Sequence, residues 1–288
     1  MMEIGVQVNN LNLLREAVKS NCTRIRFGSE FCMFKVPDID ELKAAYSMVC
    51  QSGKSFTYVV PRLSDAALEN VQKHFCFLSS LGEITVVVND LGALDILKEY
   101  PNLKPHMGRQ LVYTPARCPW SEATEFTVGF FSKHKIEEIF YQTSLNYKPT
   151  TEFFKNFGVR GADVDWIPKC FPHFDFIVKN GINLYVHLHL IPVAITRKCH
   201  MARFLKEKNL EHCPRLCDTK AFRMENDALG IEMFLNGNAI FRFVKPEKKD
   251  IEQLSRLKIS ELIITMSPLT EIETQQEIDK FIGYAMKF

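Results

Sequence analysis

The sequence has no segment suited to cross a membrane or to direct export. No run approaches the roughly 18 apolar residues that span a bilayer. The first residues, Met1-Met2-Glu3-Ile4, have neither the basic region nor the apolar stretch of a signal peptide. We therefore expect a cytoplasmic protein with no membrane insertion.

An excess of charge of either sign is also missing. Lysine and arginine number 36 against 34 acidic residues, which gives a net charge of +2. So small a charge produces no long-range field, and nucleic acid is not indicated as a partner. Hydrophobic residues make up 46% of the chain, enough for a sizeable core of a globular protein.

Several catalytic signatures are absent as well. The sequence contains no Gly-x-Ser-x-Gly elbow, no phosphate-binding loop and no His-Glu-x-x-His helix. No Gly-x-Gly-x-x-Gly turn follows any predicted strand, which removes the main reason to expect a doubly wound dinucleotide-binding sheet.

The first two thirds of the chain alternate between strand and helix patterns. The stretch 84–88 is almost continuously β-branched, as expected for a strand that is buried on both faces. Eight strands in such alternation favour a parallel sheet closed into a TIM-type (β/α) barrel. The predicted strands are 3–8, 24–27, 55–60, 84–88, 106–112, 138–142, 162–164 and 182–188.

From about Thr196 the alternation ends. A hairpin is predicted around Asn236-Gly237, followed by a polar helix at 247–257, a strand at 261–265 and a last amphipathic helix. No low-complexity linker divides the chain. We expect a single barrel domain over 1–288, with a metal-binding segment at 199–217 and a short C-terminal extension at 218–288.

Nine cysteines are an odd number, and a reducing compartment disfavours a disulfide framework. Cys22, Cys50 and Cys76 fall in helical patterns, where free cysteine is a small apolar filler. The spacing Cys199-x13-Cys213-x3-Cys217 is different, because its last two thiols lie one helical turn apart.

Three soft ligands in one segment indicate either a 4Fe–4S cluster or a zinc site. His200 and His212, next to two of the cysteines, keep a mixed Cys/His zinc site open. The other alternative is three unrelated buried cysteines. The basic neighbours argue against it, because such a segment does not resemble a core: Arg197, Lys198, Arg203, Lys206, Lys208 and Arg215.

Candidate catalytic residues follow the predicted strands, where barrel enzymes build their sites. His187 and His189 alternate along one strand, so they are predicted to share a face. Asp163 and Asp165 could do acid–base work. We expect a pocket at the barrel mouth, lined by Arg62 and one of the two histidines, that takes an anionic or aromatic substrate.

Several motifs together resemble a known family. They are Cys199-His200-Met201-Ala202-Arg203, the Cys213-x3-Cys217 pair, Leu235-Asn236-Gly237, Arg24-Ile25-Arg26-Phe27-Gly28 and Asn89-Asp90-Leu91-Gly92. The chain resembles the collagenase-like peptidase family of unclassified catalytic type. It is most similar to that family's single-barrel branch of oxygen-independent ubiquinone hydroxylation.

The resemblance implies a 4Fe–4S cluster and, in this branch, a paralogous subunit as heterodimer partner. Its Gly-x-x-x-Cys after strand two reads Gly28-Ser29-Glu30-Phe31-Cys32 here, which makes Cys32 the expected fourth ligand beside Cys199, Cys213 and Cys217. Cys170 and Cys118 are the alternatives. The implied activity is hydroxylation or related redox chemistry on an aromatic or quinone-precursor substrate. A peptidase and a non-catalytic cluster-bearing subunit remain open.

Overall fold

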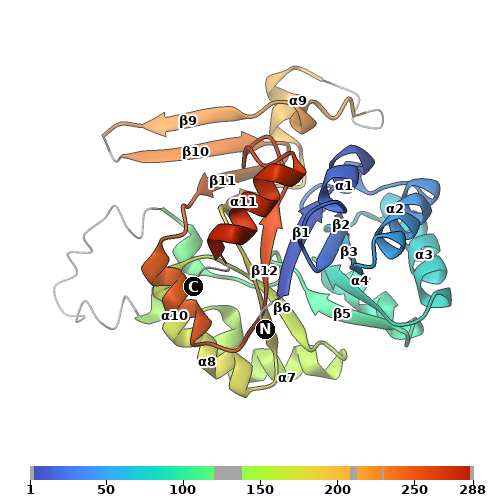
Figure 1. Cartoon of the computed structure of the whole chain (residues 1–288), viewed down its shortest axis with the longest axis horizontal. Coiled ribbons are helices and arrows are strands. Elements are labelled where there is room, and N and C mark those ends of the chain that lie inside the picture. The colour runs from blue at the N-terminus through green and yellow to red at the C-terminus, as the bar shows by residue number, and fades with distance from the viewer. Residues whose placement is uncertain (1–2, 120–137, 208–212, 229, 286–288) are drawn as a thin grey trace.

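The chain forms a closed barrel of eight parallel strands with helices on its outside (Figure 1). The computed structural model describes residues 3–119, 138–207, 213–228 and 230–285. Around the barrel the order is β1-β12-β7-β6-β5-β4-β3-β2. The bounds are β1 Glu3–Val8, β2 Arg24–Gly28, β3 Ser55–Val60, β4 Ile84–Val88, β5 Leu103–Met107, β6 Gly161–Asp165, β7 Asn183–His187 and β12 Ile259–Thr265. The expected TIM-type barrel is confirmed.

Helices follow most of these strands and cover the outer face of the barrel. Aspartates cap two of them, because the Asp38 carboxylate accepts the Glu41 amide at 2.7 Å and that of Asp90 accepts the Ala93 amide at 2.7 Å. The α-helices are α1 Leu11–Ala17, α2 Ile39–Gln51, α3 Asp65–Ser80, α4 Leu91–Ile96, α7 Lys148–Asn156, α8 Phe171–Lys179, α9 His200–Phe204, α10 Lys248–Ser255 and α11 Gln275–Ala285. No helix of the described residues is both long and apolar enough to cross a bilayer.

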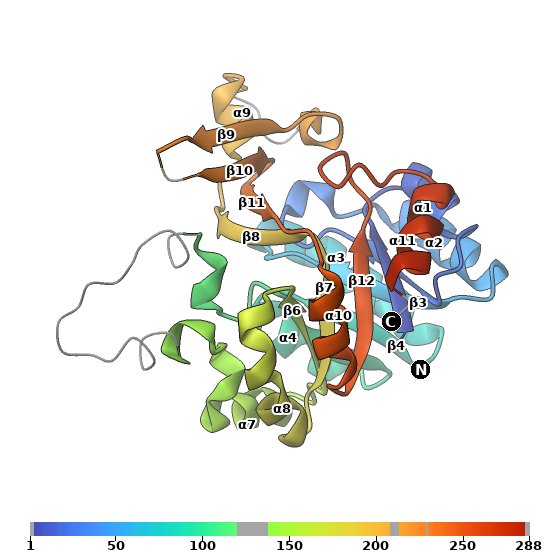
Figure 2. The ribbon, with the colours of Figure 1, turned by 60° about the vertical axis from the view of Figure 1, so that its left-hand side comes forward.

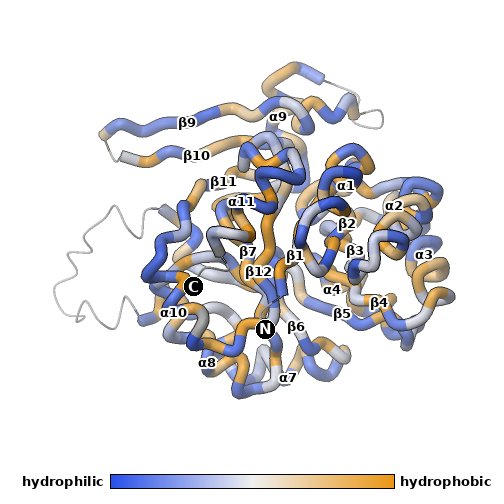
Figure 3. The backbone as a smooth tube through the Cα atoms, viewed as in Figure 1, coloured by the Kyte–Doolittle hydropathy of each residue, from blue (hydrophilic) through white to orange (hydrophobic). Residues whose placement is uncertain are grey.

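One predicted strand is wrong, and the eighth strand comes from elsewhere. Residues 138–141 are helical, not part of a strand over 138–142. The barrel is closed instead by β12, which pairs with β1 on one side and β7 on the other. β12 lies within 218–288, so the segment expected to be an extension contributes a strand to the barrel. Its sequence, Ile-Ser-Glu-Leu-Ile-Ile-Thr, is suited to a buried strand (Figure 3).

A second sheet stands beyond the barrel mouth, in the order β8-β11-β10-β9 (Figure 2). Its strands are β8 Leu190–Ile195, β9 Phe222–Asn226, β10 Ile231–Asn236 and β11 Ala239–Phe243. The hairpin predicted at Asn236-Gly237 is confirmed, with Gly237 at a φ of 63°, which favours glycine. Together with α9, this hairpin reaches over the end of the barrel (Figures 1 and 2).

The inside of the barrel is charged, whereas most barrels of this type are filled with branched apolar side chains. Arg26 from β2 meets Asp163 from β6 across the interior, and its guanidinium lies 3.6 Å from Glu261 of β12. Gly5 in β1 makes room for the Glu261 carboxylate, since a Cβ there would lie 2.0 Å from Oε1. The apolar core therefore lies between the strands and the surrounding helices.

A candidate metal centre beside two pockets

Four cysteines from separate parts of the chain come together at the barrel mouth; we call Cys32, Cys199, Cys213 and Cys217 the cysteine group. Cys199, Cys213 and Cys217 line one cavity. Cys32 shares a second cavity with Cys199. The thiols of Cys199 and Cys217 are near enough to that of Cys32 to affect its pKa.

The local structure explains how these cysteines are positioned. Cys32 precedes the short helix η1 (Met33–Lys35), where the Ser29 hydroxyl accepts the Cys32 amide at 3.2 Å and donates to its carbonyl at 2.9 Å. Cys199 caps α9, since its Sγ accepts the Ala202 amide at 3.4 Å. Cys217 lies in the short helix η6 (Leu216–Asp218), beneath the hairpin turn at Gly237.

Burial keeps two of these thiols, those of Cys32 and Cys217, protonated. It raises the pKa of Cys32 to about 11, with neighbouring thiols adding to the rise. Burial also raises the pKa of Cys217, although Lys35 donates to its sulfur and opposes the shift. Binding a metal here would therefore have to displace protons.

The donor set fits a soft metal centre in kind and in number, because four thiols are what a 4Fe–4S cluster or a tetrahedral zinc site takes. Their orientation is a different matter. Among the described residues, no three His, Cys, Asp or Glu side chains are arranged to hold one ion. To bind one metal centre, the thiols would have to rotate toward a common point. For Cys199 this means giving up the hydrogen bond that its Sγ accepts from the Ala202 amide. Cys199 and Cys217 also belong to a small apolar cluster with Met201 and Leu235.

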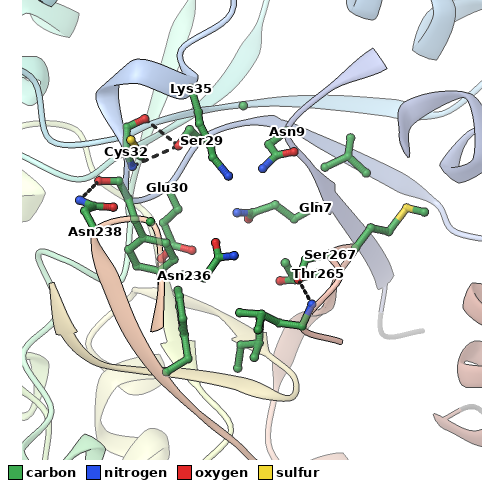
Figure 4. Close-up of a pocket in the computed structure, with 18 of the residues that line it drawn as sticks. Gln7, Asn9, Ser29, Glu30, Cys32, Lys35, Asn236, Asn238, Thr265 and Ser267 are labelled. Atoms are coloured by element: carbon green, nitrogen blue, oxygen red, sulfur yellow. Dashed lines mark hydrogen bonds between the residues drawn. The ribbon is translucent and has the colours of Figure 1, made fainter. Parts of the chain in front are cut away.

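A pocket opens at the barrel mouth beside the cysteine group, and we call it the mouth pocket (Figure 4). It is formed where β1, β2 and β12 end and where the hairpin turn of the second sheet reaches over them. Carboxamides and hydroxyls dominate its polar lining: Gln7, Asn9, Ser29, Asn236, Asn238 and Thr265. Gln7 Oε1 and Thr265 Oγ1 are buried and have no hydrogen-bond partner.

A second pocket lies on the other side of Cys32, and we call it the side pocket. The loop after β3, η1 and the end of β8 form its walls, and Arg62, Arg197 and Cys199 are among its lining residues. Asn238 lines both pockets. Its Nδ2 donates to the carbonyls of Phe31 and Thr196 and so joins the two segments that carry these residues.

The floor of the mouth pocket is a buried ion network. Arg109 donates to both carboxylate oxygens of Glu30, at 2.7 and 2.6 Å, and lies 3.1 Å from Asp165. Arg117 donates to the other oxygen of Asp165 at 2.5 Å. Burial alone would raise the pKa of Asp165, but these two arginines outweigh it and lower that pKa. Asp165 is therefore an ionised partner of two arginines.

The two candidate histidines do not share a face, so that prediction is wrong. His187 ends β7 inside the barrel, fully buried, with Nε2 3.0 Å from Asp163. His189 lies beyond the strand at a φ of 71°, and its ring packs on Phe281 and Phe243 with centroids 4.4 and 5.4 Å away. Left-handed backbone after the strand end breaks the alternation on which the prediction depended. Neither histidine is among the lining residues of the two pockets.

Other predicted residues are distributed as follows. Arg62 lines the side pocket and not the mouth pocket, because the loop after β3 turns away toward η1. The alternative ligands Cys170 and Cys118 do not line the cavities of the cysteine group. His200 lies at the start of α9, and His212 falls outside the described residues.

Sequence reasoning missed Lys35, Arg109 and Asn238. Lys35 comes three residues after Cys32 in the sequence, and this closeness to a predicted ligand was the signal that could have identified it. Asn238 comes directly after the Asn236-Gly237 turn. Arg109 had no such signal, because nothing in its local sequence announces that it will meet Glu30 across the barrel.

Comparisons with known proteins find only structural similarities at low sequence identity. No family model and no curated protein matches the chain. Among solved structures, the U32 peptidase Mk0906 is similar with 12% identity, 93% coverage of both chains and a TM-score of 0.47. A xylose isomerase domain protein from Planctomyces limnophilus has 8% identity over 99% of this chain and 96% of its own, with a TM-score of 0.46. Dihydropteroate synthase from Thermus thermophilus has 11% identity over 100% and 94%, with a TM-score of 0.43. Such distant similarities say nothing about activity.

Proposed function

We propose that this chain is an iron–sulfur protein that holds a 4Fe–4S cluster through Cys32, Cys199, Cys213 and Cys217. One observation carries the proposal: four cysteines, distributed from residue 32 to residue 217, gather at the barrel mouth while the other described cysteines lie elsewhere. Zinc is the alternative occupant of the same four thiols.

The proposed role is oxygen-independent hydroxylation or related redox chemistry on a small aromatic substrate, carried out with a paralogous subunit. The cluster would supply one-electron redox chemistry. The mouth pocket, which Cys32 also lines, is where we place the substrate. Its carboxamides would orient a polar ring substituent, and Phe31 and Phe241 offer an aromatic wall, with ring centroids 5.2 Å apart.

The mouth pocket argues for an uncharged substrate over an anionic one. Each charged side chain that lines it is already paired with a described residue, Arg109 with Glu30 and Lys35 with Asp218. An anion would have to break one of these buried pairs. We therefore place the anionic ligand that the sequence predicts in the side pocket and not in the mouth pocket.

Anaerobic reconstitution tests the proposal. Iron, acid-labile sulfide and visible absorbance should be measured together on the purified chain, alone and with a co-encoded paralogue. We expect four iron and four sulfide per chain, lost in each of Cys32→Ala, Cys199→Ala, Cys213→Ala and Cys217→Ala. The controls are Cys50→Ala, at an exposed position of α2, and Cys22→Ala, at a buried position, and both should keep the cluster.

Zinc bound without sulfide would replace the cluster by a structural metal site. Full iron content in Cys32→Ala would remove Cys32 from the ligand set. Turnover of an aromatic substrate by the chain alone would make it the catalytic subunit, whereas turnover only with an intact paralogue would make it the cluster-bearing partner.

A further inference from the structure

The side pocket carries positive charge that no residue of the described chain neutralises. Arg62 and Arg197 both line it, and neither forms an ion pair with a described residue. Its lining contains no aspartate or glutamate. Arg62 is partly buried and Arg197 is exposed. Two cations without an ionic partner in one pocket favour an anion.

A hydroxyl donor faces the same pocket. Ser64, the N-cap residue of the 16-residue helix α3, lines it and makes no side-chain capping bond. Its hydroxyl can therefore donate to a ligand. Arginine guanidinium groups and a hydroxyl together are suited to carboxylate or phosphate oxygens.

The remaining walls are apolar and aromatic. Phe31, Met33, Phe34, Leu63 and Ile195 also line the pocket. Gln110 contributes one polar atom, because its Nε2 donates to the Glu30 carbonyl while its Oε1 is buried without a partner. A ligand that places an O–H or N–H at this oxygen would satisfy it.

We propose that the side pocket binds a small organic anion, with its carboxylate or phosphate on Arg62 and Arg197 and its apolar body against Phe31 and Phe34. A hydroxyl on that body would donate to Gln110 Oε1. This places an anionic ligand directly beside Cys32 and Cys199, across Asn238 from the mouth pocket. In this proposal the mouth pocket binds an uncharged ligand and the side pocket binds a charged one.

The proposal does not require the cluster, because the arginine and phenylalanine side chains that would hold the anion are not among the proposed cluster ligands. Isothermal titration calorimetry should be run on the metal-free chain and on the anaerobically reconstituted chain. The probes are benzoate, phenylphosphonate, benzamide and inorganic phosphate. Benzamide has the size and ring of benzoate without its charge, and inorganic phosphate has charge without the apolar body.

We expect benzoate or phenylphosphonate to bind at least tenfold more tightly than benzamide and inorganic phosphate, and the stronger of the two identifies the anionic group. Arg62→Gln and Arg197→Gln should each weaken that binding roughly tenfold, as expected for loss of one charge-assisted hydrogen bond. The exposed Arg256, which is in no ion pair among the described residues, provides the control variant Arg256→Gln and should bind like the wild type.

Equal binding of benzoate and benzamide would overturn the proposal, as would unchanged affinity in Arg62→Gln and Arg197→Gln. Inorganic phosphate binding as tightly as phenylphosphonate would overturn the apolar half of it. A chain that takes up iron and sulfide but binds neither organic anion refutes this inference and leaves the proposed function standing. A chain that binds the anion but takes up no iron does the reverse.

Discussion

Lys35 and Asp218 form an ion pair across the cysteine group, with 2.6 Å between Nζ and Oδ1. Lys35 comes three residues after Cys32, and Asp218 directly follows Cys217. The lysine is only 8% exposed, and it also donates to the Cys217 sulfur. The pair therefore holds together two of the loops that carry the proposed ligands.

Replacing this lysine should loosen both loops. Lys35→Met leaves Asp218 with Arg215 alone, at 3.0 Å, and removes the hydrogen bond to Cys217. Because one partner of a largely buried pair is lost, we expect the free energy of unfolding to fall by about 1–3 kcal/mol. Reconstituted iron should also be lost faster to a chelator. Urea denaturation and chelation kinetics measure the two effects.

The matched control is Lys43→Met, which removes an exposed lysine 3.5 Å from Asp40. Exposed pairs contribute little, so this variant should change stability by less than about 0.5 kcal/mol. Equal stability of the Lys35 and Lys43 variants would show that the buried pair does not tie the loops together.

The second prediction separates a structural Asp165 from a catalytic one. Both of its oxygens are bound, by Arg109 and by Arg117, inside the barrel. Asp165→Asn keeps the shape but leaves two buried arginines with less compensation, so we expect it to destabilise the chain by about 2–4 kcal/mol. Thermal and urea unfolding measure this. An Asp165→Asn variant as stable as the wild type would contradict the network and return this residue to the catalytic candidates.

The sequence predicts the strands whose local residue pattern is distinctive, but it does not predict how distant strands pair. Continuous β-branched stretches such as 84–88 identify their strands without help from the rest of the chain. The stretch 138–142 is too short for its apolar spacing to distinguish helix from strand, which is why the strand predicted there is wrong. Strand β12 is recognisable as a strand, but its place between β1 and β7 depends on long-range pairing that no local pattern contains.

Some parts of the candidate site can likewise be predicted from the sequence, and others cannot. Cysteine spacing and the Gly28-x-x-x-Cys32 motif point to the cysteine group from the sequence alone. The walls of the pockets are not predictable in this way, because they bring Gln7 and Asn238 together from two different sheets. The distance around the barrel between the ligand loops also depends on long-range pairing. In the closed barrel, β1 and β12 both lie between β2 and β7.

Thiol reactivity provides the third prediction. The thiolate is the reactive form, and burial raises the pKa of Cys32 to about 11 and also raises that of Cys217. In the folded metal-free chain at about pH 7.5, we expect Cys50 and Cys76, both exposed, to react with a thiol reagent well before either of them. Mass spectrometry of partially alkylated protein gives the order. If Cys32 reacted as fast as Cys50, the mouth pocket would be more open to solvent than its geometry indicates.

The last prediction concerns acid stability and the role of His189. Burial lowers the pKa of His74, His106 and His189 to about 4, and it takes that of His187 well below its ordinary value. In the unfolded chain each of these histidines takes up a proton near about pH 6.5. The unfolded state therefore binds more protons than the folded state as the pH falls from about 7 toward about 4, and the free energy of unfolding decreases over that window.

His189 allows this to be tested at one position, because its ring packs between aromatic side chains, on Phe243 and Phe281. Phenylalanine fills the same space and cannot take up a proton. Between about pH 7 and pH 5, His189→Phe should lose about 2 kcal/mol less stability than the wild type, the amount expected for one histidine with these two pKa values. Urea denaturation at both pH values measures the difference, and His173→Phe, at a partly buried histidine of α8, is the control.

The His189→Phe variant should also bind iron and organic anions like the wild type, because His189 lines neither pocket. A loss of activity at unchanged iron content would restore His189 as a catalytic residue, and an unchanged pH dependence would mean that its ring is hydrated in solution.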